Sequence, residues 1–555
     1  MIQNLEKRKI KVTINTNKQI LVNYGVTAKE VLRLLEMDTK DILAARINNR
    51  IRNLDHMLYG NCDLEPIKYD SMEGNRIYIR SVKFILNLAL KKLYPEMNVE
   101  VCNITDNDIY FICENYEFTN DMAVEILKEM RTLVADDVSF ERKVLNYEQA
   151  KYLFETTKDK RELENLSYRT DTNITIYVAG DNYGIVDGVI VPSASYTPNF
   201  NIKKFRRGFV LMMPDGKDID KLDNRIVESP LYKVFEERTD FLDVIKVRSV
   251  YELNKKVIDG DMEDIIRVSE AEHNRKFAEL LQDIEKKGHK KIILVAGPSA
   301  SGKTTFSKRL TVNLRLIGYN PIVISMDNYF KERVDTPLQE NGEYDFETVD
   351  ALDLKLFNKD MKNLFNGKKI NMPEFNFVTG CKEYPGNFLK LGEKDVLIVE
   401  GIHALNPLIL KDVDDKLKYK IYIAPMTTLN VDDYSKVSTT DTRMLRRILR
   451  DYTKRGNDVE KTLSMWANLM KGESKYITPY IKYADYIFNT SYVYEIGAIR
   501  TFVEPLLLKV DSTSKYFSET RRLCTFIQKF LPIETTEIPA DSIIREFIGK
   551  SSFSR

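Results

Sequence analysis

The 555-residue sequence is poor in cysteine and histidine. Its five cysteines are scattered without any Cys-x-x-Cys spacing, and no two of its four histidines stand at metal-ligand spacing. A disulfide framework and a structural zinc site are therefore not expected. The cysteine usage fits a reducing compartment.

Long apolar runs and an excess of charge of one sign are also missing. No run is long enough to span a bilayer, and the opening "MIQNLEKRKIKVTINTNK" has no apolar segment of signal-peptide length. Lys and Arg number 84 against 83 Asp and Glu, so nothing attracts the whole chain to nucleic acid or anionic membrane. We expect a cytoplasmic protein without a membrane partner, in which a local basic patch is still compatible with the composition.

The distribution of apolar runs indicates several domains. At 64.6 kDa the chain is too long for one ordinary core. After Gly288 the runs "KIILVAG", "PIVIS", "DVLIVEG" and "YKIYIA" are short and continuous, with helical stretches between them. This pattern is typical of buried parallel strands, so we predict a parallel sheet with helices on both faces in this part of a multidomain α/β chain.

The stretch "VAGPSASGKTT" (295–305) fits the phosphate-loop pattern G-x-x-x-x-G-K-[ST] at Gly297, Gly302, Lys303 and Thr304. Glycines let backbone N–H groups turn inward around phosphate oxygens, the lysine reaches the outer phosphates, and the threonine hydroxyl can ligate magnesium. We therefore predict ATP and Mg²⁺ as cofactors. The remaining loop positions expected to bind the nucleotide are Ser299, Ser301 and Thr305.

Two carboxylates follow predicted strands. Asp327 ends "PIVISMD" and Glu400 ends "DVLIVE". Catalytic groups in such sheets lie at the carboxyl ends of strands, where Asp327 could act as general base or orient an attacking hydroxyl and Glu400 could hold magnesium. The alternative for Asp327 is a cap on the next helix.

Four arginines recur at helical spacing in "TTDTRMLRRILRDYTKRGND". Three of them can share one face of a helix: Arg443, Arg447 and Arg450. Arginine suits bidentate contact with phosphate, and the fourth, Arg446, belongs to the same run. A solvated basic helix face is the alternative, and for Arg447 it stays open.

The C-terminal half resembles the uridine kinase and phosphoribulokinase family. The resemblance covers roughly Lys291 to Ser491 and rests on motifs that occur in the family's order: "GPSASGKTT", "SMDNYF", "EYDFET", "MPEFNFVTG", "VEGIHAL", "DTRMLRRILRD" and "YADYIFN". It implies a P-loop kinase fold with a mobile lid around the arginines. The resemblance implies four roles: catalytic base, Asp327; ribose hydroxyls, Asp345; acceptor, Arg443; ATP phosphates, Arg446. We also expect Arg450, like Lys303, to bind the nucleotide.

The acceptor segment departs from that family. Uridine kinases carry Pro-x-Tyr-Asp-Phe-x-x-His, in which the Tyr and the His face the pyrimidine. Here Phe375 and Gly380 take those two positions, with Phe377 between them. Phe375 and Phe377 are still expected to line the acceptor pocket. The lost polar groups predict a poor or unselective uridine and cytidine kinase, unless Lys382 or Tyr384 binds the base instead.

The N-terminal half resembles two other modules. "KIKVTIN", "QILVNYG" and "TAKEVLRLLE" are similar to the TGS domain, a β-grasp-like α+β fold. "RSVKFILNLALKKLYPEMNVEV" and "IVDGVIVPSASYTPNF" resemble the α+β editing domain of threonyl-tRNA synthetases. Residues that cannot hold zinc or activate water replace that domain's four polar groups: Arg80, Phe84, Val186 and Ile190.

The expected organisation is therefore a TGS-like domain (1–70), a degenerate editing-like domain (71–225), a helical linker (226–288), the kinase (289–495) and a helical tail (496–555). This order resembles a bacterial group of uridine kinase-like proteins. We expect ATP-dependent phosphorylation of a small-molecule hydroxyl, with a nucleoside as the expected acceptor. By analogy of fold, the N-terminal domains are candidates for binding RNA or a nucleotide, and a homo-oligomer is compatible with the chain.

A rival hypothesis is a nucleotide-switched, RNA- or ribosome-associated regulator with weak or vestigial kinase activity. The features that discriminate are Lys303, Asp327, Glu400 and Arg446, because a pure switch needs no acceptor base. Retention of Asp327 therefore favours the enzyme.

Overall fold

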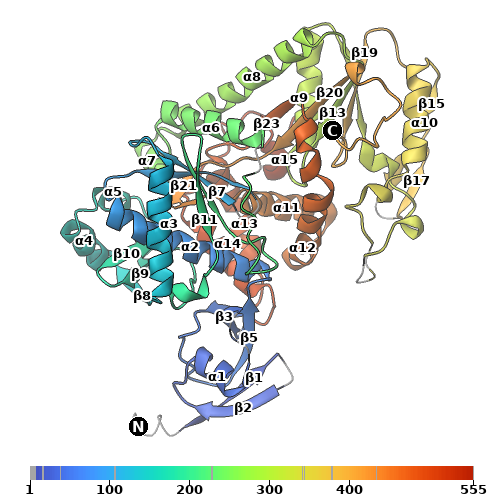
Figure 1. Cartoon of the computed structure of the whole chain (residues 1–555). Helices are drawn as coiled ribbons and strands as arrows, with labels where there is room; N and C mark the ends of the chain where they lie inside the picture. The colour runs from blue at the N-terminus through green and yellow to red at the C-terminus, as the bar shows by residue number, and fades with distance from the viewer. Residues whose placement is uncertain are drawn as a thin grey trace.

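The computed structural model describes residues 8–15, 18–37, 39, 41–105, 108–226, 229–339, 342, 344–376, 379–432 and 434–553. Figure 1 shows a small sheet at the N-terminal end, a second α+β unit above it, and a larger α/β unit beside the second. No helix of these residues is long and apolar enough to cross a membrane.

The first unit is a five-stranded sheet with the order β2-β1-β5-β3-β4, covered by helix α1. The helix begins after Thr27, which forms a capping box with Glu30. Asn48 and Asn49 both adopt positive φ, 46° and 58°, and join β3 to β4 in a tight turn. The element bounds are β1 Lys9–Ile14, β2 Lys18–Asn23, α1 Ala28–Leu34, β3 Ile42–Ile47, β4 Arg50–Arg52 and β5 Cys62–Lys68.

The second unit packs the long helix α2 against two antiparallel sheets. Ser71 caps this helix, whose apolar face enters the shared core. The sheets have the orders β11-β12-β7-β6 and β10-β9-β8. The bounds are α2 Met72–Leu93, β6 Val99–Thr105, β7 Asp108–Cys113, α3 Asn120–Ala135, β8 Glu141–Asn146, α4 Tyr147–Thr156, α5 Lys160–Leu166, β9 Asn173–Ala179, β10 Asn182–Ile185, β11 Asn201–Phe205 and β12 Gly208–Met212.

Three helices lead to the larger unit: α6 Leu231–Ile245, α7 Val250–Asp259 and α8 Met262–Lys286. The apolar side of α8 packs against the larger unit, where Phe277 stacks on Phe306 of its first helix. Gly288 follows the helix end with φ of +80°, a conformation that favours glycine at this position.

The larger unit is built on a parallel sheet with the order β14-β19-β13-β20-β23. The four strands expected from apolar runs are confirmed, and β23 adds a fifth from "YADYIFN". Alternate residues of β13 enter different cores, Ile293 on one face and Leu294 on the other, so helices and loops cover both faces. The strands are β13 Ile292–Ala296, β14 Asn320–Ser325, β19 Asp395–Glu400, β20 Lys418–Ala424 and β23 Tyr486–Asn489.

The helices of this unit are α9 Lys303–Leu316, α10 Leu354–Phe365, α11 Thr439–Arg455, α12 Val459–Tyr476, α13 Glu495–Leu508, α14 Phe517–Gln528 and α15 Arg545–Ile548. Short strand pairs lie between α10 and β19 and before α11: β15 Ile370–Asn371 with β18 Phe388–Leu389, β16 Glu374–Asn376 with β17 Cys381–Glu383, and β21 Asn430–Asp432 with β22 Ser435–Lys436. The C-terminal segment folds back, since α15 packs against α11 and α13.

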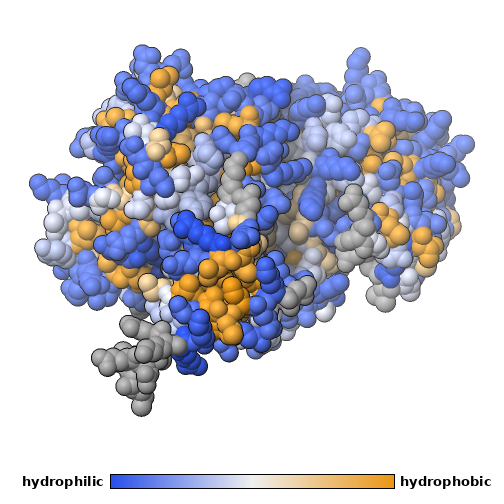
Figure 2. All heavy atoms as spheres, turned by 60° about the horizontal axis from the view of Figure 1, so that its bottom comes forward, coloured by the Kyte–Doolittle hydropathy of each residue, from blue (hydrophilic) through white to orange (hydrophobic). Residues whose placement is uncertain are grey.

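The surface in Figure 2 is mostly hydrophilic, with smaller apolar areas between. The first unit contributes four exposed large apolar side chains: Leu21, Leu34, Met57 and Tyr59.

Candidate active site

The phosphate loop runs from the end of β13 to the first residue of α9. A Cβ on Gly297 would lie 2.2 Å from the carbonyl oxygen of Ile423, and Gly302 adopts φ of +88°, so both positions require glycine. The ammonium of Lys303 donates to the carbonyls of Gly297 and Pro298, at 2.9 and 3.1 Å. The lysine therefore spans the concave side of the loop.

Two carboxylates meet Lys303 at the carboxyl end of the sheet. Glu400 ends β19 next to Ser325 of β14 and Val295 of β13. Burial, and then the charge of Asp327, raise the pKa of Glu400 to about 7, while Lys303 opposes the shift. Asp327 lies in the turn after β14, where its N–H contacts the Ser325 hydroxyl at 3.4 Å. The site thus holds one cation between two acids. The structure brings these three predicted site residues together, and their roles stay predictions.

These side chains fit a magnesium ion bound with a nucleotide. Thr304 is exposed on the first turn of α9, and Glu400 carries a carboxyl group whose pKa is raised by burial and then by the neighbouring Asp327. Mg²⁺ in phosphoryl-transfer sites takes one or two carboxylates and completes its shell with phosphate oxygens and water. Within the described ranges no three His, Cys, Asp or Glu side chains form a cluster that could hold a metal ion.

Three arginines of α11 converge on Ser299 of the loop. The guanidinium of Arg443 donates to the Ser299 carbonyl at 3.1 Å. Arg447 and Arg450 donate to the Ser299 hydroxyl at 2.6 and 3.3 Å. The face predicted from helical spacing is therefore present and points to the phosphate loop, and Arg447 is buried at 8% exposure, not solvated.

The fourth arginine lies beneath the loop. Arg446 is 0% exposed and binds the Glu495 carboxylate through Nε and Nη2, with Nη2 also 2.9 Å from the Thr490 carbonyl. Its Nη1 is 3.4 Å from the carbonyl of Ala300 and 3.5 Å from that of Ser301. All these contacts support the loop from beneath. Direct contact between Arg446 and ATP stays a prediction.

Two glutamates join the site that the sequence did not single out. Glu473 of α12 accepts the Ser299 N–H at 3.1 Å and binds Arg443. Burial, and then the charge of Glu473, raise the pKa of Glu347 to about 7. A Cβ on Gly472 would lie 2.4 Å from that of Glu347, so the close approach requires this glycine. Glu347 lies in the quoted motif "EYDFET", whereas nothing in the local sequence distinguishes Glu473.

On the acceptor side, Asp345 accepts the N–H of Glu347 at 3.1 Å and donates its own N–H to the Pro337 carbonyl at 2.7 Å. Phe375 is buried at 8% exposure, with its ring 5.7 Å from that of Phe330. Phe377 lies outside the described residues. The structure therefore places Asp345 in contact with Glu347 of the site. It places Phe375 in the hydrophobic core next to Phe330.

Gly380 is packed under an arginine. It adopts φ of +75°, and a Cβ there would lie 2.8 Å from side-chain atoms of Arg333. The Arg333 N–H also donates to the Gly380 carbonyl at 2.8 Å. Nearby, Lys382 is tied to Asp353 by an ion pair of 2.9 Å, and Tyr384 is 51% exposed. The side chain of Arg333 therefore covers the position where uridine kinases carry histidine.

The C-terminal segment reaches the phosphate loop. Glu546 of α15 accepts the N–H and the hydroxyl of Thr305, at 3.2 and 2.9 Å. The Phe547 ring lies 4.9 Å from the guanidinium of Arg446, and the Phe553 carbonyl accepts from Lys308 at 2.6 Å. The sequence predicted a closing helix here without chemistry, because nothing local indicates a partner so far back in the chain.

A phosphate loop between β13 and α9 of a parallel sheet, with flanking carboxylates and arginines, defines a P-loop kinase. The family model described as "Phosphoribulokinase / Uridine kinase family" matches residues 292–496, and the chain belongs to this family. Residues 1–291 lie outside the match.

Two uridine kinases are among the similar proteins. That of Staphylococcus haemolyticus (strain JCSC1435) is 31% identical over 222 residues, which cover 40% of this chain and 95% of that protein. That of Staphylococcus aureus (strain Newman) is 28% identical with the same coverage.

Two solved structures are similar to the same part. One is described as a possible uridine kinase from Bacillus stearothermophilus, with 17% identity, TM-score 0.26, and coverage of 38% of this chain and 100% of that chain. The other is D-glycerate 3-kinase from Cryptococcus neoformans, with 13% identity, TM-score 0.26, and coverage of 38% and 89%. At these TM-scores neither structure carries an argument about this chain.

Proposed function

We propose that the protein transfers a phosphoryl group from ATP to a hydroxyl of a small molecule of the nucleoside class. The observation that carries the proposal is the convergence of Lys303, Asp327 and Glu400 at one edge of the parallel sheet, because a phosphoryl transferase needs all three functions. Burial lowers the pKa of Lys303, with Glu400 and Asp327 opposing the shift. A lysine held between acids stays available as a counter-charge for phosphate.

Each residue has a role that follows from its position. Lys303 and the loop N–H groups stabilise charge on the transferring group, and Asp327 orients the acceptor hydroxyl and accepts its proton. Mg²⁺, when bound, neutralises phosphate charge, with Thr304 and Glu400 as the residues that would hold it.

The arginines divide into two groups in this proposal. Arg443, Arg447 and Arg450 hold the outer side of the loop through Ser299, and Arg450 is the one with remaining exposure, at 16% for its side chain. Arg446 positions the loop from below. Arg446 and Glu495 form an ion pair that is shielded from solvent, so the main role of Arg446 is to hold the site in shape.

The acceptor is proposed to differ from uridine and cytidine. A site that hydrogen-bonds a polar edge can discriminate by several powers of ten, whereas an apolar slot manages far less. Gly380 provides no such group, and the space in front of it is filled by Arg333. Asp345 would retain the contact with ribose hydroxyls.

We also propose that residues 1–70 and 71–225 are the TGS-like and editing-like domains, without hydrolytic activity. Phe84, Val186 and Ile190 are buried apolar side chains, and Arg80 donates to the Val189 carbonyl at 2.7 Å. None of these groups can hold zinc or act as a base at neutral pH.

One observation favours the regulator as a second candidate: the Glu546 carboxylate occupies donors of the phosphate-loop helix. A screen of ATP consumption by the purified full-length protein against nucleosides, phosphorylated sugars and vitamins separates the two. The kinase produces stoichiometric ADP and phosphorylated acceptor with at least one compound. The regulator binds ATP and forms no product with any compound.

A further inference from the structure

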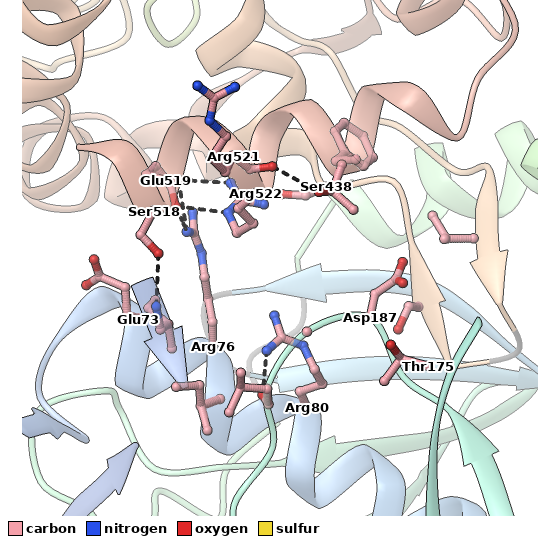
Figure 3. A pocket seen from close by; sticks show the side chains of 18 of the residues that line it. Glu73, Arg76, Arg80, Thr175, Asp187, Ser438, Ser518, Glu519, Arg521 and Arg522 are labelled. Atoms are coloured by element: carbon pink, nitrogen blue, oxygen red, sulfur yellow. Dashed lines mark hydrogen bonds and ion pairs between the residues drawn. The ribbon is translucent and has the colours of Figure 1, made fainter. Parts of the chain in front are cut away.

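A large cavity lies away from the phosphate loop, between the N-terminal units and the C-terminal helices. Its walls come from β4, α2, β8 and β9 on one side and from α14 and the start of α11 on the other (Figure 3). Its volume is about 1990 Å³. Pockets for small ligands usually measure about 300 to 1,000 Å³, so this cavity is about twice the upper end of that range.

The cavity is positively charged although the whole chain is balanced. Twelve Lys and Arg residues line it against seven Asp and Glu residues. Six of those seven carboxylates are already in ion pairs. Glu519 and Asp441, for example, hold Arg76 and Arg522, and Asp187 pairs with Lys529. Figure 3 shows the Arg76–Glu519–Arg522 group, which joins α2 on one wall to α14 on the other. Because these carboxylates are already paired, they do not neutralise the cations of the lining that have no acid partner.

Five arginines of the lining have no carboxylate partner among the residues that the structure describes: Arg50, Arg52, Arg80, Arg142 and Arg521. Arg80 uses one donor, on the Val189 carbonyl, and burial together with the charge of Arg522 lowers its pKa to about 10. Arg142 donates to the Thr175 hydroxyl at 3.2 Å. Arg52 donates to the Ile51 carbonyl at 3.3 Å, and Arg521 donates to the Leu508 and Val510 carbonyls at 3.3 and 3.4 Å. These bonds use a minority of the guanidinium donors, so the others are available to a ligand.

The same arginines repel one another. Burial, and then the charges of Arg50 and Arg142, lower the pKa of Arg52. Burial, and then Arg52 and Arg142, likewise lower the pKa of His56, another residue of the lining. Cations held this close without an acid between them are relieved by a bound anion, and the planar guanidinium fork matches phosphate.

Apolar side chains lie between the cations. Ile51, Ile79, Ile174, Val189 and Phe140 contribute to the lining. A wall that alternates arginines with apolar surface suits a ligand with phosphates on one side and flat rings on the other. Bases pack on such surfaces while arginines follow the backbone.

We propose that this cavity binds a single-stranded stretch of nucleic acid. Backbone phosphates contact Arg52, Arg80 and Arg142, and bases pack on the apolar wall. The volume selects a strand of several nucleotides over a mononucleotide. This site goes beyond the proposed kinase reaction and does not depend on it, since no residue of the phosphate loop lines the cavity.

The test uses the full chain with Lys303→Ala, which removes phosphate binding at the loop. The probe is a fluorescein-labelled 12-nucleotide oligouridine, followed by fluorescence anisotropy at several salt concentrations between 50 and 200 mM. We expect saturable binding with the slope of log K against log salt that phosphate contacts produce. Arg52→Gln with Arg142→Gln should weaken binding at least tenfold and reduce that slope by about 1 to 2.

Arg131→Gln is the matched control, because Arg131 is an exposed arginine of α3 that does not line the cavity. It should change the dissociation constant less than twofold. Circular dichroism and the melting temperature test whether the double variant is folded. If it is not, the single variant Arg142→Gln is measured instead, because Arg142 is exposed. That variant should weaken binding at least threefold.

Three results would overturn the proposal: no binding of the probe at 50 mM salt, equal binding by the double variant and the control, or displacement of the probe by UTP or inorganic tripolyphosphate at equal molar affinity. The last result identifies a small anion as the ligand. None of these results bears on kinase activity, which is measured with Lys303 intact.

Discussion

Glu546 accepts two hydrogen bonds from Thr305, one from its backbone N–H at 3.2 Å and one from its hydroxyl at 2.9 Å. Thr305 lies in the first turn of α9, where the N–H groups and the helix dipole favour an anion. A carboxylate from the chain's own C-terminal segment thus uses donors that a nucleotide phosphate needs. Docking of this segment and binding of ATP are expected to compete.

Replacing Glu546 should therefore improve ATP binding. Glu546→Gln removes the charge and keeps an acceptor, so the KM for ATP should fall roughly three- to tenfold, the range expected for a weakened charge-assisted bond. Steady-state kinetics at fixed acceptor concentration measure it. Glu537→Gln, at an exposed residue of the same segment, is the control and should leave the KM unchanged. An unchanged or higher KM for Glu546→Gln would show that the carboxylate does not compete with the nucleotide.

The stability of the nucleotide-free protein should fall as pH rises through 7. Glu347 has a pKa raised to about 7 by burial and by Glu473, against about 4.5 in the unfolded chain. Between these values the folded state binds the proton more tightly, so the stabilisation is fully present below pH 4.5 and is lost as pH rises through 7.

Glu347→Gln keeps the shape and removes the titration. It should stabilise the protein at pH 8 by about 1 to 3 kcal/mol and flatten the pH dependence between 5 and 8. Urea unfolding at four pH values measures both effects. Identical pH profiles for the variant and the wild type would contradict the assignment.

Arg446 and Arg450 should behave in opposite ways. Arg446→Met leaves Glu495 buried without its partner and should destabilise the protein by about 3 to 5 kcal/mol. Arg450→Gln should change stability by less than about 1 kcal/mol, because the side chain is partly exposed, yet raise the KM for ATP. Thermal unfolding together with kinetics separates the two. Arg446→Met with full stability and lost ATP binding would make Arg446 a direct phosphate ligand.

Uridine and cytidine should be poor acceptors. Gly380 offers the base no polar group, and Arg333 packs against it. We expect kcat/KM below about 10⁴ M⁻¹s⁻¹ for both pyrimidine nucleosides and a higher value for another nucleoside or hydroxylated metabolite of similar size. A panel of acceptors under equal conditions measures this. A clear preference for uridine or cytidine would mean that Lys382, Tyr384 or Arg333 recognises the base.

The sequence predicts the parts of the site that depend on local pattern. The phosphate loop, the strands that carry Asp327 and Glu400, and the arginine face of α11 all follow from spacing and periodicity. Periodicity alone does not separate Arg446 from Arg450, four residues further along the same helix; only the packed structure shows that Arg446 lies beneath the loop.

Contacts between distant segments have no such local signal. Glu546 reaches Thr305 across 241 residues, and Glu473 reaches Ser299 across 174. The charged cavity is assembled from many separate stretches of chain, so the balanced composition conceals it. Only the packing of the units brings these side chains together.

The most direct test of the account compares the wild type with Asp327→Asn for ATP-dependent phosphorylation of the best acceptor, with product detected by mass spectrometry. Asn retains the size of the side chain and removes the base, so we expect unchanged ATP binding and a loss of turnover of at least about 100-fold. Full phosphorylation by Asp327→Asn would contradict the role of Asp327. ATP binding by the wild type without product on any acceptor would contradict the assignment of kinase activity itself.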